Sequence, residues 1–287
     1  TGDDAILGGS FTLLNEFDVN RIAVFSDSDN SLTPLISGNT NGSVRELLVE
    51  GNTLYIGGDF STFNAVSRNR FAQYDLLNDE LSDFTIDFSG SVYAIDKVGD
   101  QLYFGGTFTF VDGESRTRVC EYDLNTGLTA WNPTPINTVL DIEVESGKIL
   151  VGGFFNAFPV GSRERIVSID LTDESINDLS LDFSSGTVVD MALDGDNLYF
   201  GGSFTSVNGE TRRRLGSVNV NSGALNPLAL DVNNTVNSLA IQNNTLYFGG
   251  SFTDVDGNET LILASVITLT GTIDAFNPQL HSTVEDI

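Results

Sequence analysis

The chain has 287 residues and carries 40 Asp and Glu side chains against 13 Lys and Arg, for a formal net charge of −27. This acidity disfavours nucleic acids and anionic membrane surfaces as partners, because both require a basic footprint on the protein. A single cysteine, Cys120, excludes an intrachain disulfide, and no apolar run is long enough for a transmembrane helix.

A repeat organises the whole sequence. The dipeptide Gly-Gly occurs six times at intervals of 49, 48, 47, 49 and 48 residues. A period of this size is typical of a β-propeller, in which each repeat forms one four-stranded blade. The dipeptides are Gly8-Gly9, Gly57-Gly58, Gly105-Gly106, Gly152-Gly153, Gly201-Gly202 and Gly249-Gly250.

The predicted elements recur at fixed offsets from the glycines. In chain order they are the half-repeat Ala5–Thr12, then Leu215–Asn219, a weak outer strand near Leu228–Leu230, Val236–Ile241, Thr245–Gly250, and the last strand Ser282–Ile287. No stretch has a helical apolar period of useful length. The glycine pair follows the second strand, where a Cβ would obstruct close backbone packing or forbid a bulge.

Three further columns accompany the glycines. A Val stands fourteen residues before the second glycine, and a Phe stands two residues after it. Three copies then carry a pair that readily adopts positive φ in a hairpin. These pairs are Asp112-Gly113, Asn208-Gly209 and Asp256-Gly257.

The two ends of the chain are complementary halves of one repeat. Val284 has no Gly-Gly after it, and Gly8-Gly9 has no Val strand before it. We therefore expect the C-terminal strand to pair beside the N-terminal one and to close a ring of six blades, which removes exposed sheet edges. Residues 1–287 are then one domain, and the chain is expected to be a mature or excised segment of a larger protein.

The string from Leu198 to Leu215, with Asn125-Thr126-Gly127 leading to Trp131-Asn132-Pro133, resembles the delta-60 repeat propellers of secreted and surface-attached bacterial proteins. The layout is also similar to kelch repeats. The resemblance covers essentially the whole chain. It implies a module of a large exported protein, often beside adhesive or anchoring domains, and it transfers no catalytic residue.

Acidic residues recur two positions after the repeated Val. If that strand is innermost, Glu46, Asp141, Asp190 and Asp286 ring the central channel. Close carboxylates repel each other unless a cation, water or a shared proton relieves them, so one interpretation is a Ca²⁺ or cationic-ligand site. The alternative is a set of solvated carboxylates around a wet channel.

Nine arginines fall in two columns that precede the third strand. Ion pairs or carbonyl hydrogen bonds between blades are the structural interpretation, and a cationic ring for anionic glycans is the functional one. The first column is Arg21, Arg70, Arg118, Arg165 and Arg214, and the second is Arg68, Arg116, Arg163 and Arg212.

Two kinds of loop are further candidates. Phe154, Phe155 and Phe158 replace the usual turn in the fourth copy, either as a ligand-binding aromatic platform or as a variant hairpin. Asp254–Glu259 and Asp194–Asn197 resemble fragments of calcium loops, but neither has the EF-hand spacing, so turn chemistry is favoured.

Signals for catalysis are sparse. His281 is the sole histidine, which excludes multi-histidine metal sites and leaves a serine triad with one conceivable base. We therefore expect a non-enzymatic, monomeric recognition, adhesion or spacer module, extracellular or at the cell surface, that binds protein or glycan. The alternative is a carbohydrate-active or lactone-hydrolysing enzyme that uses channel carboxylates, with calcium as its possible cofactor.

Overall fold

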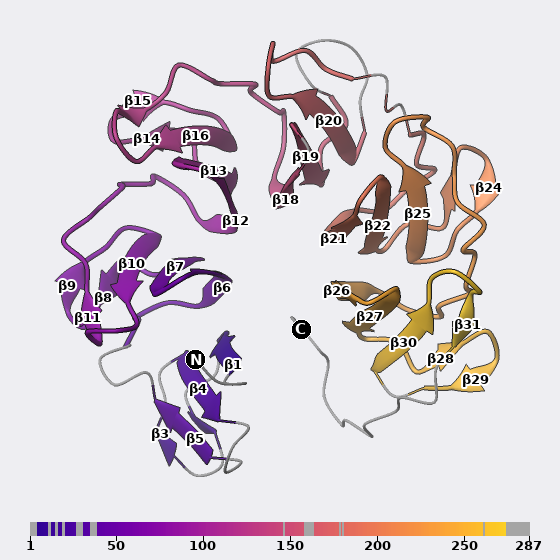
Figure 1. Ribbon diagram of the computed structural model, residues 1–287, viewed down its shortest axis with the longest axis horizontal. Coiled ribbons are helices and arrows are strands. Elements are labelled where there is room, and N and C mark those ends of the chain that lie inside the picture. The colour runs from indigo at the N-terminus through magenta and orange to yellow at the C-terminus, as the bar shows by residue number, and fades with distance from the viewer. Residues whose placement is uncertain are drawn as a thin grey trace. The chain divides into compact units, whose positions relative to one another are not determined.

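Contacts divide the chain into two units, Thr1–Thr134 and Pro135–Ile287. The structure is a computed structural model, and it describes residues 5–10, 13–14, 17–18, 21–26, 31–34, 39–145, 147–157, 164–177, 179, 181–260 and 262–273. All regular elements in these ranges are antiparallel β-strands (Figure 1). A search of the same ranges finds no helix long and apolar enough to cross a bilayer.

The first unit contains three sheets, one for each of the first three repeats. Sheet 1 has the order β1(Ala5–Gly8), β4(Ile22–Ser26), β5(Ser31–Pro34). Sheet 2 has the order β6(Val44–Glu50), β7(Thr53–Gly58), β10(Phe71–Asp75), β11(Glu80–Leu81). Sheet 3 has the order β12(Val92–Val98), β13(Gln101–Gly106), β16(Val119–Asp123), β17(Gly127–Leu128).

The second unit repeats this arrangement for the last three repeats. Sheet 4 has the order β18(Val139–Glu145), β19(Lys148–Gly153), β20(Ile166–Asp170). Sheet 5 has the order β21(Val188–Asp194), β22(Asn197–Gly202), β25(Leu215–Asn219). Sheet 6 has the order β26(Val236–Gln242), β27(Thr245–Gly250), β30(Leu263–Ile267), β31(Thr272–Ile273).

Within each unit, the strands that begin at the repeated Val lie next to one another. In the first unit β6 contacts β1 and β12, and in the second β21 contacts β18 and β26. We call the strand that begins at this Val the first strand of its sheet, and the strand that ends in Gly-Gly the second. Consecutive sheets therefore pack along their first strands.

A short hairpin stands between the second and third strands of five repeats. In three of these hairpins the expected Asp-Gly or Asn-Gly pair occupies the turn with positive φ at both residues, for example 52° at Asn208 and 76° at Gly209. This confirms the turn prediction. The hairpins are β2(Leu13–Leu14) with β3(Phe17–Asp18), β8(Thr62–Phe63) with β9(Val66–Ser67), β14(Phe110–Val111) with β15(Glu114–Ser115), β23(Ser206–Val207) with β24(Glu210–Thr211), and β28(Asp254–Val255) with β29(Asn258–Glu259).

The Gly-Gly pair lies where two backbones approach too closely for a side chain. A Cβ on Gly202 would lie 2.0 Å from the backbone oxygen of Thr187, in the segment that enters the first strand of the same sheet. A Cβ on Gly201 would lie 2.6 Å from Cγ1 of Val236, in the first strand of the next sheet. The first strand also has a register shift directly after its Val, between Val188 and Asp190 in sheet 5. These contacts confirm the structural explanation of the glycines.

The repeated Phe and Val columns form the cores of the sheets. Phe60, Phe108, Phe155, Phe204 and Phe252 are completely buried, and each repeated Val from Val44 to Val236 is at most 3% exposed. Aromatic rings meet within a sheet, as at Phe200 and Phe204, whose centroids are 5.4 Å apart. The core therefore repeats with the sequence period.

The outer strand predicted near Leu228–Leu230 is wrong. In sheet 5 the outer edge is a single bridge between Val218 and Leu225. The chain then leaves the sheet, because the Asn226 carbonyl accepts a hydrogen bond from Arg212 Nη2 at 3.2 Å. Leu228 and Leu230 instead turn into the core against the next sheet.

The predicted closure of the ring falls on residues outside the described ranges, since these end at residue 273 and Val284 and His281 come later. Within the described residues, sheet 1 consists of β1, β4 and β5, and β1 pairs with β4. The coarse fold, an all-β chain with repeated antiparallel sheets, agrees with the sequence.

Burial changes the acid–base chemistry of several groups. Burial raises the pKa of the Cys120 thiol, as expected for an inert core thiol. Burial, reinforced by the Glu121 carboxylate that accepts its hydrogen bond at 3.0 Å, also raises the pKa of Tyr103 well above its ordinary value.

Alkaline pH is therefore expected to destabilise the first unit. The folded protein holds the Tyr103 proton more tightly than the unfolded chain, so this stability is complete below about pH 10 and is lost as pH rises above that value. Trp131, whose ring lies 5.9 Å from that of Tyr103, should report the change in its fluorescence. Tyr103→Phe should remove this contribution, and titration of Tyr103 near pH 10 in the folded protein would contradict the assignment.

Candidate binding site

The carboxylates after the repeated Val bind backbone amides. One oxygen of Asp141 accepts the N–H of Ile142 at 2.7 Å, and the other accepts the N–H of Met191 in the next sheet at 2.7 Å. Asp190 accepts the N–H of Leu239 in the following sheet at 2.5 Å. The carboxylates of Asp141 and Asp190 therefore connect neighbouring sheets.

This arrangement differs from the predicted cation site. Among the described residues, no three His, Cys, Asp or Glu side chains gather closely enough to hold a metal ion. Glu46 accepts the N–H of Leu47 at 3.1 Å, and Asp286 lies outside the described residues. Both Asp141 oxygens serve backbone donors. Asp141 and Asp190 thus connect neighbouring sheets through backbone hydrogen bonds, and the predicted ring of four carboxylates stays a prediction.

The first arginine column binds backbone carbonyls, in its own repeat at Arg70 and Arg214 and in the segment before β6 at Arg21. Arg214 Nη1 donates to the carbonyls of Ser203 and Phe204, the latter at 3.0 Å, and Arg70 donates in the same way to Asp59 and Phe60. The residues of this column also adopt positive φ, 68° at Arg214. This confirms carbonyl hydrogen bonding, but for these two arginines it acts inside the repeat and not between repeats.

Three arginines of the second column hold the outer segments of sheets 2, 3 and 5. Arg68 Nη2 donates to Ser82 O at 2.7 Å, and Arg212 Nη2 donates to Asn226 O at 3.2 Å. Arg116 makes the equivalent contact with Thr129 O. Arg163 lies outside the described residues. Because the guanidinium groups of Arg68, Arg116 and Arg212 bind backbone carbonyls, these three residues favour the structural interpretation over a cationic ring for anionic glycans.

The acidic hairpins serve turns. Asp256 accepts the N–H of Asp231 at 2.6 Å, and Asp254 accepts the N–H of Gly257 at 2.8 Å. The Asp254–Gly257 bond is the local side-chain to backbone bond that Asp makes in turns, and the Asp256–Asp231 bond ties this turn to the segment before β26. The favoured interpretation of Asp254–Glu259 as turn chemistry is confirmed.

The predicted aromatic platform divides between core and surface. Phe155 is completely buried, so the prediction of a ligand contact is wrong at this position, where the repeat requires a core Phe. Phe154 is 48% exposed, and Arg165 Cζ lies 5.0 Å from its ring centroid. Phe158 lies outside the described residues.

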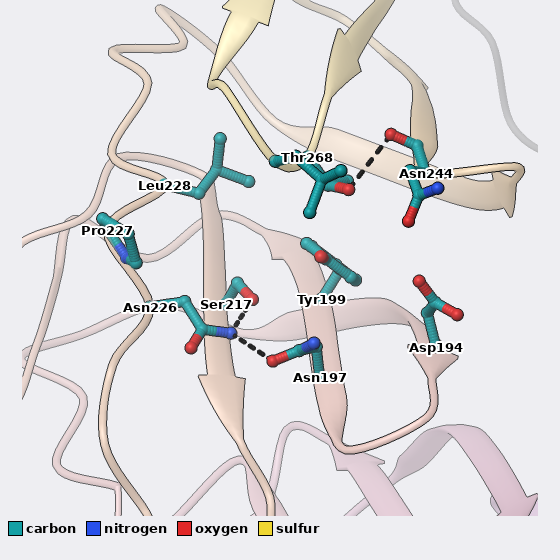
Figure 2. A pocket seen from close by; sticks show the side chains of 10 residues that line it. Asp194, Asn197, Tyr199, Ser217, Asn226, Pro227, Leu228, Asn244 and Thr268 are labelled. Atoms are coloured by element: carbon teal, nitrogen blue, oxygen red, sulfur yellow. Dashed lines mark hydrogen bonds between the residues drawn. The ribbon is translucent and has the colours of Figure 1, made fainter.

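A pocket of about 210 Å³ opens between sheets 5 and 6, within the second unit (Figure 2). Sequence analysis missed it, although Asp194 and Asn197 from one of the acidic segments contribute to it. The residues that line it are Asp194, Asn197, Tyr199, Ser217, Asn226, Pro227, Leu228, Asn244, Thr268 and Leu269.

Hydrogen bonds fix the polar side of this pocket. Asn226 Nδ2 donates to Ser217 Oγ at 2.8 Å and to Asn197 Oδ1 at 3.0 Å. The backbone of Asn226 is held on both sides, since its N–H donates to Ser217 O at 2.8 Å and its carbonyl accepts from Arg212. The amide is therefore oriented before any ligand arrives.

The opposite side comes from sheet 6. Thr268 Oγ1 donates to the carbonyl of Asn244 at 3.0 Å, and Tyr199 also lines this side of the pocket. Burial raises the pKa of Tyr199, so its phenol is neutral at physiological pH. Amide, hydroxyl and phenol groups thus line the pocket, with the Asp194 carboxylate as its single formal charge.

Comparisons with known proteins support the all-β fold and assign no family to the chain. No family model matches the chain. A segment of 67 residues is 31% identical to the polarized growth protein RAX2 of Candida albicans, and it covers 23% of this chain and 5% of that protein. The match therefore concerns a small part of a much longer relative.

Solved structures match nearly the whole chain at low identity. The extracellular domain of a protein from B. thetaiotaomicron, described as a one-component system, has 17% identity and a TM-score of 0.58, over 98% of this chain and 36% of that one. A computationally designed protein, Ika8, has 13% identity and a TM-score of 0.57, over 99% and 90% of the two chains. A chain of the mitotic checkpoint complex has 13% identity and a TM-score of 0.62, over 92% and 74%.

Proposed function

We propose that the six repeats form a six-bladed β-propeller of the delta-60 type, closed by residues 282–287 beside β1. Five of the six sheets have their first strand paired to a second strand and packed against the first strand of a neighbour in the same unit, namely β6, β12, β18, β21 and β26. In sheet 1 the second strand, β1, has its first-strand partner missing among the described residues. Residues 282–287 contain Val284, the Val that begins a first strand in the other repeats, and they could therefore supply the missing partner of β1.

Removal of residues 282–287 tests this closure. The truncated chain is expected to lose about 3 kcal/mol or more of unfolding free energy, because a long paired strand and its buried Val would be lost from sheet 1. Urea unfolding followed by circular dichroism measures the loss. An unchanged midpoint for the truncated chain would contradict closure by this segment.

Recognition of a glycan or protein, outside the cell or at its surface, is the function that we propose for this propeller. The observation that carries it is the pocket between sheets 5 and 6, whose neutral polar groups are fixed by the surrounding sheets. The net charge of −27 suits a soluble exterior domain, and one similar structure is an extracellular domain.

The enzymatic alternative depended on free carboxylates along the first strands. Asp141 and Asp190 accept backbone N–H groups from neighbouring sheets, which is a reason to assign them to structure. The recognition module is consequently the better supported hypothesis.

A glycan array probed with the purified chain, followed by calorimetry of any hit with and without calcium, tests the proposal. We expect saturable binding of at least one glycan class without its conversion. The absence of binding to glycans and to candidate surface proteins, together with turnover of a substrate, would overturn the proposed recognition function.

A further inference from the structure

The residues around the pocket between sheets 5 and 6 can be compared with their equivalents in other repeats. Backbone hydrogen bonds define the equivalence: Asn226 donates its N–H to Ser217 O, as Ser82 does to Gln73 O and Thr129 does to Glu121 O. Counting two residues onward, Leu228 corresponds to Phe84 in sheet 2 and to Trp131 in sheet 3.

In those two repeats the equivalent residue is an aromatic ring that packs against a tyrosine. Phe84 packs edge-on against Tyr122 of the next sheet, with ring centroids 5.7 Å apart. Trp131 packs edge-on against Tyr103 at 5.9 Å. In sheet 5 the shorter Leu228 leaves Tyr199 without such a cover, and the pocket forms above it.

Between sheets 4 and 5 a polar link crosses the corresponding position. Lys148 corresponds to Asn197, Asn221 corresponds to Leu269, and Lys148 Nζ donates to Asn221 Oδ1. At sheets 5 and 6 the same two positions hold Asn and Leu, which make no ion pair or side-chain hydrogen bond of this kind. Sheet 4 also has a leucine at the position of Leu228, because Asn177 donates its N–H to Ser168 O and Leu179 follows two residues later. The positions of Lys148 and Asn221 therefore distinguish the groove between sheets 5 and 6 from the one between sheets 4 and 5.

The lining determines which ligand fits. At about 210 Å³ the pocket is smaller than the roughly 300–1,000 Å³ of sites for drug-sized ligands, so it accepts a single small ring or the end of a longer chain. The amides and hydroxyls of the lining can donate hydrogen bonds to ligand hydroxyl groups and accept hydrogen bonds from them. Leu228 and Leu269 offer apolar contact to C–H groups of the ligand. The Asp194 carboxylate, with no cation in the lining, repels an anion.

We propose that this pocket binds one neutral monosaccharide unit, the terminal residue of a glycan. This inference rests on the proposed recognition function and specifies its ligand. Asn226 and Asn197 supply amide hydrogen bonds to ring hydroxyls, Asp194 accepts from a further pair of hydroxyls, and Leu269 at the rim, 80% exposed, covers an apolar ring face.

Leu228→Phe is the decisive variant, because the fold already accommodates Phe at this position in sheet 2. Methyl hexosides are titrated against the isotope-labelled protein by NMR, and the wild type is expected to show saturable shifts with a Kd on the order of 1 mM. Leu228→Phe should weaken this binding at least tenfold. Thr211→Phe is the matched control, since it adds the same ring at an exposed site in β24, and it should bind as the wild type does.

Asp194→Asn separates neutral from charged ligands. Glucuronate is expected to bind the wild type at least tenfold more weakly than methyl glucoside, and Asp194→Asn should reduce that difference. Tight binding of an amino sugar that Asp194→Asn abolishes would instead identify a cationic ligand and overturn the proposal.

The experiment also distinguishes the pocket from the function. Glycan-array signals that are equal for wild type and Leu228→Phe would overturn the pocket assignment and leave the proposed recognition function intact. Absence of hexoside shifts in the wild type up to about 100 mM would likewise overturn the pocket assignment. The melting temperature of Leu228→Phe must equal that of the wild type for this comparison. If it is lower, Ser217→Gln, which copies Gln73 of sheet 2, replaces Leu228→Phe in the experiment.

Discussion

Gly202→Ala is expected to destabilise the second unit by about 3 kcal/mol or more. The new Cβ would lie 2.0 Å from the backbone oxygen of Thr187, far inside van der Waals contact. That oxygen cannot move away freely, because it accepts the N–H of Ser203 at 3.0 Å and lies beside the register shift of β21. The sheet would have to separate its first and second strands.

Urea unfolding followed by circular dichroism measures this effect. Gly209→Ala is the control, because Gly209 has a φ of 76° and its Cβ would meet nothing within 4 Å. Only backbone strain of about 1 kcal/mol is expected there. Equal losses for the two variants would show that the close approach at Gly202 has no special cost.

Arg214→Ala is expected to cost about 2–3 kcal/mol, because two backbone carbonyls lose a charged donor. Arg214 also adopts a φ of 68°, which a residue with a Cβ adopts at a cost. Arg214→Gly removes the guanidinium and relieves that strain, so it should be more stable than Arg214→Ala by about 1 kcal/mol.

Arg213→Ala is the matched neighbour. Its Nε lies 3.5 Å from Asp231, with 56% and 62% of the two side chains exposed, and it should change stability by about 0.5 kcal/mol at most. If instead Arg214→Ala leaves stability unchanged and weakens glycan binding, the first arginine column belongs to a binding surface.

The candidate site could be predicted from the sequence only in part. The carboxylates at Asp141 and Asp190 were found by their period, but their partners are backbone amides of other sheets, which no pattern of side chains reveals. At Phe155 the sequence interpretation was wrong. Phe155 belongs to the repeated Phe column of the core, but beside Phe154 and Phe158 it was assigned to an exposed aromatic loop. A smaller residue in place of Phe84 and Trp131 does not by itself locate the pocket, because sheet 4 has Leu179 at the same position.

The sequence by itself determined the repeat, the antiparallel strands, the hairpin turns and the core columns. These depend on local rules: Gly where a Cβ has no room, Asp-Gly or Asn-Gly where φ is positive, and alternating apolar residues along a strand. The tertiary structure alone decided that the strand predicted at Leu228–Leu230 turns into the core, that Arg70 and Arg214 bind carbonyls of their own repeat, and that a pocket opens between sheets 5 and 6. Each of these outcomes depends on a distance between segments remote in sequence, and a repeat pattern fixes which residues are equivalent without fixing what lies opposite them.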